Sequence, residues 1–576
     1  MHYPFDEFRN EIYGQLRKIL SDEDLAKTKL DTPPSYDMGD LALACFPLAR
    51  QFKKSPDAIA EDIASKVECK GWISRVETVR GYVNFFINYD RLSSKTLDLI
   101  RKKGKDYGSF EKKGKKVIIE HTSANPNGPL HVGRARNPII GDTLVRIYKF
   151  YGYDVEAQFY VDDLGKQVAI LAWGIKNIDP SKLPPPSRNK PDHELVRFYQ
   201  EAHRLMEEDE TVAEQINEIT RLCESGDENA INSVRDAYEK ALEGIKESLR
   251  RLNIEFDSFI PESKFVRDGS VEEVVEKLKK LEYADHEGDA WYIDMEPFGI
   301  KGRDTRFFFT RRDGTTLYAT RDIAYHIWKS KQADILINVL GEDHKLEAKQ
   351  VEIALELLGV KNKPNVVFYA FVNLPEGRMS TRRGRVVYLD DLIDEAVERA
   401  YEEVKKRRGQ ELSEEKIRKI AESVGIGAVR YNIIKIQPEK DIVFKWEDAL
   451  NFEGNSAPFI QYAHARACSI LRKISTEHLD KIDATLLKHK QEVILIKTLA
   501  RFPDVVRDSC SNNKPHSIPN YLFDLASQFN QFYRDCPVIR AEDKELKKSR
   551  LALVDATKTV LENGLKLLGI DALEEM

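Results

Sequence analysis

The sequence lacks the patterns that mark secreted, zinc-stabilised and membrane-spanning proteins. Its six cysteines are isolated and form no Cys-x-x-Cys pair, so we predict neither a cysteine zinc site nor a disulfide framework. No stretch approaches the roughly 18 uncharged apolar residues that a membrane helix needs. The N-terminal residues show no basic region followed by an apolar one, so we expect no secretory signal. These absences favour a cytoplasmic protein that does not bind a membrane.

An excess of positive charge is also missing. Lys and Arg number 90 and Asp and Glu 96, which gives a net charge of −6. This excludes a strongly basic protein that binds nucleic acid over its whole surface. A local basic surface remains possible, because phosphate contacts depend on where the charges lie. Residues 101–116 are rich in Lys and Gly and form either a solvated linker or a strip that faces RNA.

Short apolar segments alternate with helical patterns in the middle of the chain. The segments at 117–119, 155–161, 335–340 and 366–371 are of the buried-strand type. Their separation by helices predicts a parallel sheet that is covered on both faces. Long charged helical patterns over about 175–262 interrupt this alternation, so we expect a helical insertion between two halves of the sheet.

The length favours several domains, since 576 residues give three to four at about 150 residues each. We predict an N-terminal α+β domain over 1–108, a parallel-sheet α/β domain over 109–412 and an all-helical bundle over 413–576. Apolar residues in the last part recur at helical spacing, which is typical of a buried helix face. One such stripe consists of Leu522, Leu525, Ala526, Phe529, Phe532 and Tyr533.

The first segment with chemical content is 120–134, which reads Glu-His-Thr-Ser-Ala-Asn-Pro-Asn-Gly-Pro-Leu-His-Val-Gly-Arg. It connects a predicted strand to a predicted helix, and open α/β sheets hold their ligands at such strand ends. His131 falls at the helix start, where phosphate is also attracted, and Gly133 leaves space for a flat base. The segment is either a nucleotide site or a helix start with a capping histidine.

Residues 129–133, Pro-Leu-His-Val-Gly, resemble the HIGH signature of class I aminoacyl-tRNA synthetases. The wider segment, with Glu120, Asn125 and 137–142, resembles arginyl-tRNA synthetases. This resemblance implies a Rossmann-like catalytic domain in which His131 and Arg134 are catalytic. Arg134 replaces the last histidine of the signature, and a guanidinium can also contact phosphate or ribose oxygens.

A second segment, 378–385, reads Arg-Met-Ser-Thr-Arg-Arg-Gly-Arg and is similar to the KMSKS loop of the same class. The two lysines of that pattern are replaced by Arg378 and Thr381, and two further arginines follow. The resemblance implies that this loop stabilises the triphosphate and contacts ATP. The residues concerned are Arg378, Met379, Ser380, Arg382 and Arg383.

A third segment, 312–325, places Tyr318 and Asp322 four residues apart, so that they share a face of a helix. A planar guanidinium favours a carboxylate for paired hydrogen bonds and an aromatic ring to pack on. In arginyl-tRNA synthetases the matching tyrosine and aspartate line the arginine pocket. The resemblance also implies further residues, which are Glu120, Asn125 and Gln167 for arginine and His131, Gly133 and Asp343 for ATP.

The remaining resemblance concerns tRNA. Residues 452–466 resemble the start of the helical anticodon-binding domain of arginyl enzymes, and 1–100 resemble their extra N-terminal domain. Interleaved polar and aromatic side chains are typical of sites for unpaired bases. The predicted tRNA contacts are Asn84, Gln461, Tyr462, His464 and Arg466.

The resemblance implies an arginine–tRNA ligase that uses ATP to convert L-arginine into arginyl-adenylate and then transfers it to the 3′ end of tRNA(Arg). Mg²⁺ accompanies the ATP and is held mostly by phosphates and water, so no protein metal ligand is assigned. A monomer is expected. Two alternatives remain, namely another class I synthetase and a noncatalytic tRNA-binding or scaffold protein. Intact His131, Gly133, Met379 and Ser380 favour the enzyme.

Overall fold

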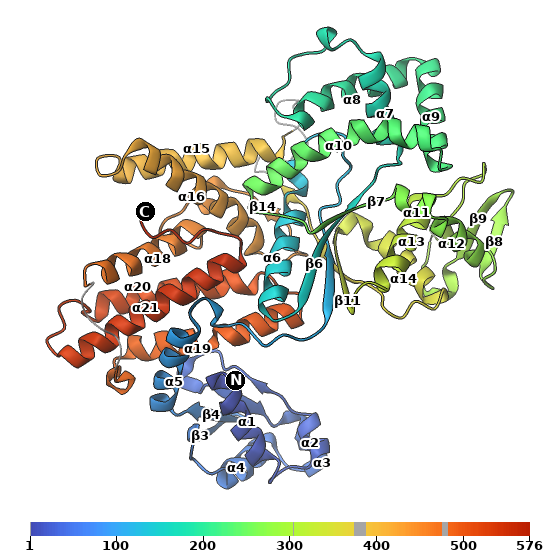
Figure 1. The fold of residues 1–576 in the computed structure, drawn as a ribbon. Coiled ribbons are helices and arrows are strands. Elements are labelled where there is room, and N and C mark those ends of the chain that lie inside the picture. The colour runs from blue at the N-terminus through green and yellow to red at the C-terminus, as the bar shows by residue number, and fades with distance from the viewer. Residues whose placement is uncertain (1, 303–304, 374–386, 475–481) are drawn as a thin grey trace.

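A computed structural model describes residues 2–302, 305–373, 387–474 and 482–576. Figure 1 shows a small N-terminal domain at the bottom of the view, a helical domain on the left, and an α/β domain on the right with helices above it. The predicted class, a multidomain α/β protein with a helical C-terminal part, is confirmed. No helix within the described ranges is long and apolar enough to cross a membrane.

The N-terminal domain packs helices against an antiparallel sheet of order β1-β2-β4-β3. Its strands are β1 (Leu30–Asp31), β2 (Leu41–Ala44), β3 (Ile73–Val79) and β4 (Tyr82–Ile87). Its helices are α1 (Pro4–Leu16), α2 (Asp22–Ala26), α3 (Ala49–Phe52), α4 (Pro56–Lys66) and α5 (Tyr89–Lys103). Ser55 and Asn88 accept hydrogen bonds from backbone N–H groups in the first turns of α4 and α5, which fixes where these helices begin.

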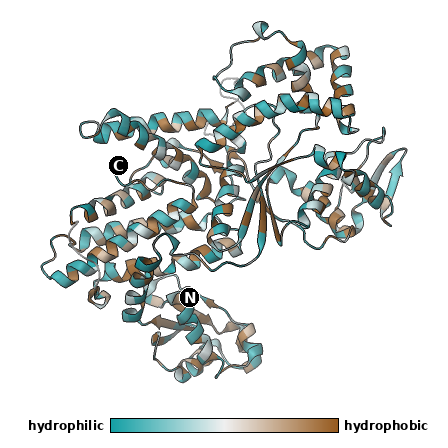
Figure 2. Cartoon of the chain, viewed as in Figure 1, coloured by the Kyte–Doolittle hydropathy of each residue, from teal (hydrophilic) through white to brown (hydrophobic). Residues whose placement is uncertain are grey.

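The catalytic-domain candidate is built on a five-stranded parallel sheet of order β12-β11-β5-β6-β7. Its strands are β5 (Lys116–Glu120), β6 (Asp154–Val161), β7 (Ser258–Pro261), β11 (Ile335–Gly341) and β12 (Asn365–Tyr369). Figure 2 shows these strands as mostly hydrophobic, as expected of a sheet buried on both faces. The strand order reverses at β5, which pairs with both β6 and β11. In open α/β sheets, ligands bind at the carboxyl ends beside such a switch point.

Helices cover this sheet and extend beyond it. They are α6 (Arg136–Phe150), α7 (Lys166–Asn177), α8 (Pro191–Glu208), α9 (Glu210–Glu224), α10 (Glu228–Arg251), α11 (Ser263–Arg267), α12 (Ser270–Leu278), α13 (Tyr318–Ser330) and α14 (Lys345–Leu357). The predicted insertion corresponds to α8, α9 and α10, which form the upper part of Figure 1 together with α7. A small antiparallel sheet that was not predicted follows, with β8 (Ala284–Glu287), β9 (Ala290–Asp294) and β10 (Arg306–Phe308).

The C-terminal part is helical. It comprises α15 (Leu389–Arg408), α16 (Glu414–Ile434), α17 (Trp446–Ala449), α18 (Ala457–Arg472), α19 (Lys490–Ser511), α20 (Ser517–Asp535) and α21 (Lys544–Leu567), with the two-strand pair β13 (Val372–Asn373) and β14 (Ile442–Val443) beside it. The stripe from Leu522 to Phe532 is buried as predicted, and Tyr533 at its end is exposed. The helix α15 packs along α16 through Ala400 and Val424, so the packing continues across the boundary predicted at 412.

Arg430 joins three parts of the chain from a fully buried position on α16. Its Nε donates to the Leu568 carbonyl at 2.6 Å, and its terminal nitrogens donate to the Leu252 carbonyl and to the Asp142 carboxylate. These partners follow α21, follow α10 and lie on α6, respectively. One guanidinium therefore holds the helical domain, the insertion and the sheet domain against one another.

Candidate active site

The loop after β5 crosses the carboxyl edge of the sheet in a strained conformation. Thr122 and Ser123 have φ values of +69° and +41°, and a left-handed conformation is unfavourable for a β-branched residue. The Asn137 side chain holds the loop, because its Oδ1 accepts from the Thr122 N–H at 2.7 Å and its Nδ2 donates to the Val339 carbonyl at 3.0 Å. The first turns of α6 thus tie this loop to β11.

His131 caps the short helix Val132–Arg134 that follows this loop. Its Nδ1 accepts the Gly133 N–H at 3.1 Å, so the neutral ring carries its proton on Nε2. Burial, aided by the charge of Arg134, lowers the pKa of His131 below its ordinary value. A side chain at Gly133 would place a Cβ 3.2 Å from Nδ1. The ring is therefore held as a neutral Nε2–H donor.

Arg134, in the short helix Val132–Arg134, and Asp343, just after β11, both act on Tyr369 at the end of β12. Burial raises the pKa of Tyr369, the last residue of β12, while Arg134 lowers it and Asp343 raises it. The hydrogen bond that His344 donates to Glu347 raises the pKa of His344, and the charge of Arg134 opposes this rise. The predicted nucleotide residues therefore share one rim of the sheet, and both Arg134 and Asp343 are exposed there.

Two of the predicted arginine-binding carboxylates line one hollow of about 400 Å³ between α13, α14 and the sheet. Glu120 is 5% exposed at the end of β5, and the Asp322 side chain is 34% exposed on α13. Burial opposes ionisation of Asp322, but His326 and Lys329 hold the pKa of its carboxyl below its ordinary value. A third carboxylate, Glu352, and the side chains of Lys345 and Lys349 also line the hollow.

A buried hydrogen-bonded ladder connects these two carboxylates. Lys329 Nζ donates to Glu120 Oε2 at 2.7 Å and to Asn338 Oδ1 at 2.8 Å. Asn338 Nδ2 then donates to His326 Nε2 at 2.9 Å. His326 Nδ1 donates to the Asp322 carbonyl at 2.7 Å and lies 3.1 Å from its carboxylate. The ladder fixes Glu120 and Asp322 relative to each other through side chains that sequence reasoning did not single out.

Tyr318 begins α13 one turn before Asp322 but faces different groups. A Cβ on Gly165 would lie 2.8 Å from the Tyr318 hydroxyl and 2.9 Å from Asp162 Oδ1, so the missing side chain of Gly165 lets these two groups converge. Arg321 Cζ lies 4.8 Å from the centre of the Tyr318 ring. Tyr318 is therefore set in a second group of charged side chains beside the hollow.

That second group contains Glu262, a buried carboxylate that the sequence reasoning missed. Its Oε1 lies 2.8 Å from Nε of the fully buried Arg321, and its Oε2 has no hydrogen-bond partner among the described residues. Burial raises the pKa of Glu262 well above its ordinary value. Its position directly after β7, at the same carboxyl edge as Glu120, was the available signal.

Asn125 and Gln167 lie at the same edge. Gln167, in the first turn of α7, accepts a hydrogen bond from Asn127 Nδ2 at 2.6 Å, which joins the start of α7 to the loop after β5. Asn125 lies half-buried on that loop. The predicted loop residues Arg378, Met379, Ser380, Arg382 and Arg383 fall outside the described residues.

Three family models match the chain. Residues 96–446 match "tRNA synthetases class I (R), catalytic domain", residues 460–576 match "DALR anticodon binding domain", and residues 6–87 match "Arginyl tRNA synthetase N terminal domain". The chain belongs to the arginyl-tRNA synthetase family. The predicted family is thereby confirmed, and a catalytic class I enzyme is supported over a noncatalytic scaffold.

Individual relatives of the family agree over nearly the whole chain. An arginine–tRNA ligase of Methanocella arvoryzae is 50% identical over 531 residues, covering 92% of each chain. One of Methanocaldococcus jannaschii is 43% identical over 579 residues, covering 98% of this chain and 99% of its own. The solved arginyl-tRNA synthetase of Thermus thermophilus superposes with a TM-score of 0.85 at 28% identity, covering 99% of this chain and 100% of its own.

In the helical domain of this synthetase chain, Tyr462 and Arg466 face outward from α18. Tyr462 is 41% exposed, and Arg466 Cζ lies 4.8 Å from its ring centre. Arg466 also donates to Asn530 Oδ1 at 2.6 Å. Both residues border a hollow of about 500 Å³ that further includes Arg407, Phe452 and Met576. Exposed arginine and aromatic side chains around a hollow suit an unpaired base.

The structure does not support base contacts for three residues that the sequence suggested. Gln461 and His464 are 0% and 1% exposed, because they hold the last turns of the chain. Gln461 Nε2 donates to the Asp571 carbonyl at 3.0 Å, and His464 Nδ1 donates to the Leu573 carbonyl at 2.8 Å. Asn84 is 3% exposed within the N-terminal sheet. Their side chains are enclosed by protein, so they serve the fold.

Proposed function

We propose that this chain is an arginine–tRNA ligase that converts L-arginine and ATP into arginyl-adenylate and pyrophosphate, and then transfers the arginyl group to the 3′-terminal ribose of tRNA(Arg). The observation that carries this proposal is the convergence of Glu120, Asp322 and His131 on one sheet edge. Glu120 and Asp322 in the hollow suit the two cationic groups of arginine, and the helix start with a neutral histidine donor suits the nucleotide.

The first step is an in-line attack of the arginine carboxylate on the α-phosphate of ATP. The enzyme contributes mostly by positioning and by stabilising charge. His131 donates a hydrogen bond from its Nε2–H to a phosphate oxygen, and Gly133 leaves room for the adenine beside Asp343. ATP arrives as its Mg²⁺ complex, which is held mainly by phosphates and water. By family resemblance, Arg134 and the loop residues Arg378, Met379, Ser380, Arg382 and Arg383 hold the nucleotide.

Arginine is bound at both of its ends. Asp322 recognises the guanidinium, since a carboxylate supplies paired hydrogen bonds. Tyr318 lies in the neighbouring group of side chains, and only the family resemblance assigns its ring to the guanidinium. Glu120, Asn125 and Gln167 bind the α-amino and carboxylate groups. Lys329 neutralises part of the charge on Glu120, so the substrate ammonium shares that carboxylate with a lysine.

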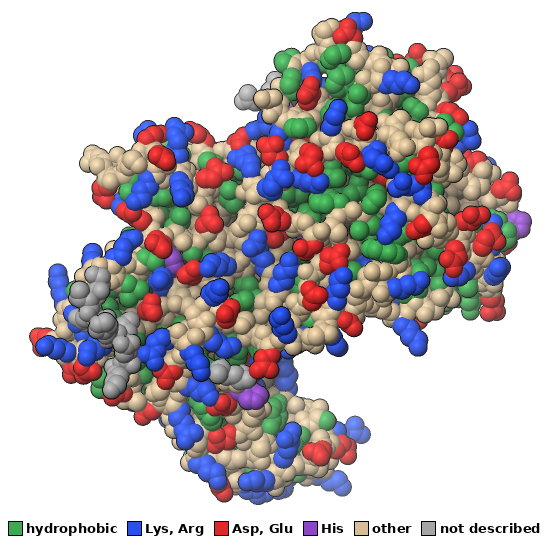
Figure 3. All heavy atoms as spheres, in the orientation of Figure 1, with side chains coloured by type: hydrophobic (Ala, Val, Ile, Leu, Met, Phe, Trp, Pro, Cys, Tyr) green, Lys and Arg blue, Asp and Glu red, His purple; other side chains and the backbone are tan. Residues whose placement is uncertain are grey.

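Recognition of tRNA is assigned to Tyr462 and Arg466 in the helical domain, supported by the exposure of Tyr462 and by the hollow that both residues line. A single chain supplies both this surface and the sheet edge, which supports action as a monomer. The cytoplasm is the proposed location, because charged tRNA is used there. Figure 3 shows Lys and Arg mixed with Asp and Glu over one face, so local placement of charge matters more than the total.

The test is aminoacylation of total tRNA by the purified chain with labelled arginine, ATP and Mg²⁺. ATP–pyrophosphate exchange is measured in parallel with each of the other amino acids in the presence of tRNA. Labelling that requires arginine, ATP and tRNA together supports the proposal. Exchange stimulated by a different amino acid contradicts the substrate, and absence of any charging contradicts the ligase function.

A further inference from the structure

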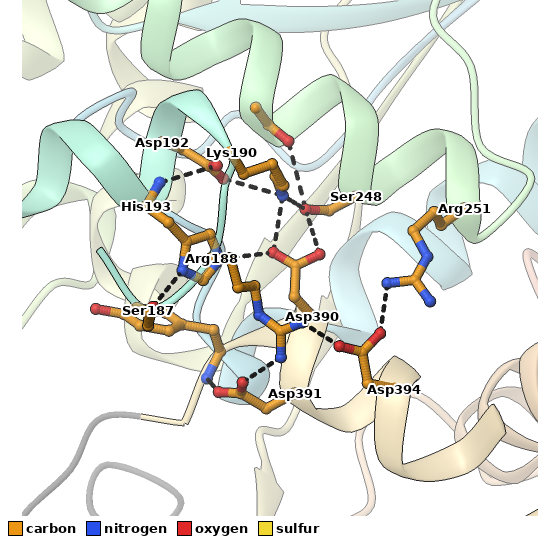
Figure 4. Close-up of polar contacts among 12 residues, drawn as sticks. Ser187, Arg188, Lys190, Asp192, His193, Ser248, Arg251, Asp390, Asp391 and Asp394 are labelled. Atoms are coloured by element: carbon orange, nitrogen blue, oxygen red, sulfur yellow. Dashed lines mark hydrogen bonds and ion pairs between the residues drawn. The ribbon is translucent and has the colours of Figure 1, made fainter. Parts of the chain in front are cut away.

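A buried polar cluster links the helical insertion to the first turn of α15, outside the site described above. Asp192, His193 and Asp390 place potential ligand atoms within 4.8 Å of one another. Figure 4 shows them pointing toward each other from two different elements. Asp192 and His193 begin α8, and Asp390 lies in the first turn of α15.

The spacing is compatible with a metal ion, but an ammonium group occupies the centre. Lys190 Nζ lies 2.7 Å from Asp390 Oδ2 and 3.2 Å from Asp192 Oδ2, and it also bonds to Ser248 on α10. His193 Nε2 lies 2.9 Å from Asp390 Oδ2. The Lys190 ammonium thus supplies, beside both carboxylates, the positive charge that a metal ion would otherwise supply. The cluster therefore serves as a connection between elements.

Asp390 is the centre of this connection. It accepts from Lys190, from His193 and, through Oδ1, from Ser248 at 2.9 Å, and it is 2% exposed. Lys190 and His193 together lower the pKa of its carboxyl despite its burial. All three partners belong to the insertion, because Lys190 caps α8, His193 lies on α8 and Ser248 lies on α10.

Further ion pairs hold the same turn of α15 from the same side. Arg188 lies 2.6 Å from Asp391 Oδ1 and also pairs with Asp394. Arg251, at the end of α10, lies 2.7 Å from Asp394 Oδ1. The insertion thus contacts three acidic residues near the start of α15, Asp390, Asp391 and Asp394, of which Asp390 is the most buried.

The residues just before Asp390 pair with the segment that carries His131. The Val132 N–H donates to the Val387 carbonyl at 3.1 Å, and the Leu389 N–H donates to the Leu130 carbonyl at 2.8 Å. His131 and Tyr388 stand opposite each other in this short antiparallel bridge. The His193 ring also packs edge-on against the Tyr388 ring, with centres 5.1 Å apart. Asp390 is thus one residue from a hydrogen bond that flanks His131.

We propose that Asp390 is a positioning residue for His131, through which the helical insertion sets where the histidine stands. This inference rests on the proposed function, in which His131 acts at the α-phosphate. The insertion holds Asp390, Asp390 fixes the first turn of α15, and the bridge of residues 387–389 with 130–132 carries that position to His131. The arginine-binding carboxylates lie on β5 and α13, outside this bridge.

The test is an Asp390→Asn variant, which keeps the shape and removes the charge. Active sites are counted by a pre-steady-state burst, so that misfolded protein does not enter the rate. We expect kcat for tRNA-dependent ATP–pyrophosphate exchange to fall by roughly 10- to 100-fold per active site, since small displacements of a positioned group cost about this much. The KM for arginine should stay within about twofold. Asp390→Glu should recover part of the rate.

The matched control is Glu398→Gln, an exposed position on the same helix, which should leave kcat within twofold. Amide hydrogen exchange gives an independent readout, and Val132 and Leu389 should exchange faster in Asp390→Asn than in wild type. If Asp390→Asn does not fold, His193→Gln is measured in the same way, because it removes one contact to Asp390 and keeps Lys190.

Three results would overturn the inference. The first is an unchanged kcat per active site, and the second is a loss of kcat with no change in amide hydrogen exchange at Val132 and Leu389. The third is a loss of kcat/KM that is explained entirely by a higher KM for arginine. If Zn²⁺ or Mn²⁺ raised the melting temperature of EDTA-treated wild type, but not of Asp390→Asn, the cluster would bind a metal ion in place of the Lys190 ammonium. That result would contradict a connection centred on Lys190. A wild type that shows no arginine-dependent exchange overturns the proposed function instead.

Discussion

Lys329 Nζ lies 2.7 Å from Glu120 Oε2, and both side chains are buried. The pair begins the ladder that runs through Asn338 and His326 to Asp322. A buried carboxylate that loses its cation is left as an uncompensated charge. The ladder therefore fixes the direction of the two carboxylates proposed to bind arginine.

Removal of the lysine tests this dependence. Lys329→Met should lower the free energy of unfolding by about 3–5 kcal/mol, which is typical for breaking a buried pair from one side, and it should raise the KM for arginine. Urea denaturation and exchange kinetics measure the two effects. Lys331→Met, at an exposed position just after the same helix, is the control. Unchanged stability would contradict a stabilising ion pair between Lys329 and Glu120.

Removal of the proposed phosphate donor tests the nucleotide site. His131→Ala should reduce kcat by roughly 10²–10³-fold, as for the loss of one donor to the transition state. The KM for arginine should change little. Exchange kinetics with saturating tRNA measure both constants, and His286→Ala, at an exposed strand position, serves as the control. A rate close to that of wild type would exclude His131 from the reaction.

The guanidinium contact can be tested in the same assay. Asp322→Asn should raise the arginine KM by about 10- to 100-fold, because a charge-assisted hydrogen bond contributes about 1.5–3 kcal/mol and each tenfold corresponds to about 1.4 kcal/mol. Asp289→Asn, on an exposed turn, should leave the KM unchanged. An unaltered KM in Asp322→Asn would place the guanidinium partner elsewhere, with Glu262 the first residue to examine.

His121 predicts a pH dependence of stability. Burial lowers its pKa to about 4, whereas an unfolded histidine titrates at about 6.5. Between these values the unfolded chain binds a proton that the folded chain does not, so stability falls as the pH falls from about 6.5 to about 4, by up to about 3 kcal/mol.

Urea denaturation of wild type and His121→Phe across this pH window measures the contribution of His121. The replacement keeps a ring against Gly141. The contact is close, because a Cβ added to Gly141 would lie 2.1 Å from His121 Cγ. The two stability curves should therefore diverge toward pH 4, with the wild type the more pH-dependent. Parallel curves would show that His121 is protonated in the folded protein.

The helical-domain hollow predicts a selective loss of tRNA affinity. Tyr462→Ala should raise the KM for tRNA by about tenfold or more, because stacking of one base contributes about 1–3 kcal/mol. Aminoacylation at varied tRNA concentration measures it. Ile539→Ala removes another exposed apolar side chain of the same domain and should have no effect. Equal KM values for both variants would exclude Tyr462 from tRNA binding.

Sequence patterns predicted the parts of this structure that depend on local periodicity or on a short signature. The parallel strands, the stripe from Leu522 to Phe532 and the position of His131 at a helix start all follow from neighbours in the chain. Lys329 was missed because a lysine on a helix is usually exposed. Its burial depends on Glu120 and Asn338, which come from two different strands.

The helix α18 shows what closer attention to spacing could have added. Tyr462 and Arg466 are four residues apart and share the exposed face, whereas Gln461, His464 and Cys468 share the buried one. Polar residues occur on both faces of α18, so composition alone did not separate the exposed residues from the buried ones. Helical periodicity did contain the distinction, but the burial of Asn84 in a sheet of unpredicted strand order had no comparable signal.

Arg430 has a mechanical consequence for the whole molecule. Its buried guanidinium contacts the sheet domain, the insertion and the chain end after α21. Movement of any of the three away from Arg430 would remove partners from a buried charge, which is unfavourable. The distance between the hollow beside Tyr462 and the sheet edge is therefore held nearly constant. We therefore expect a bound tRNA, rather than this distance, to adjust on binding.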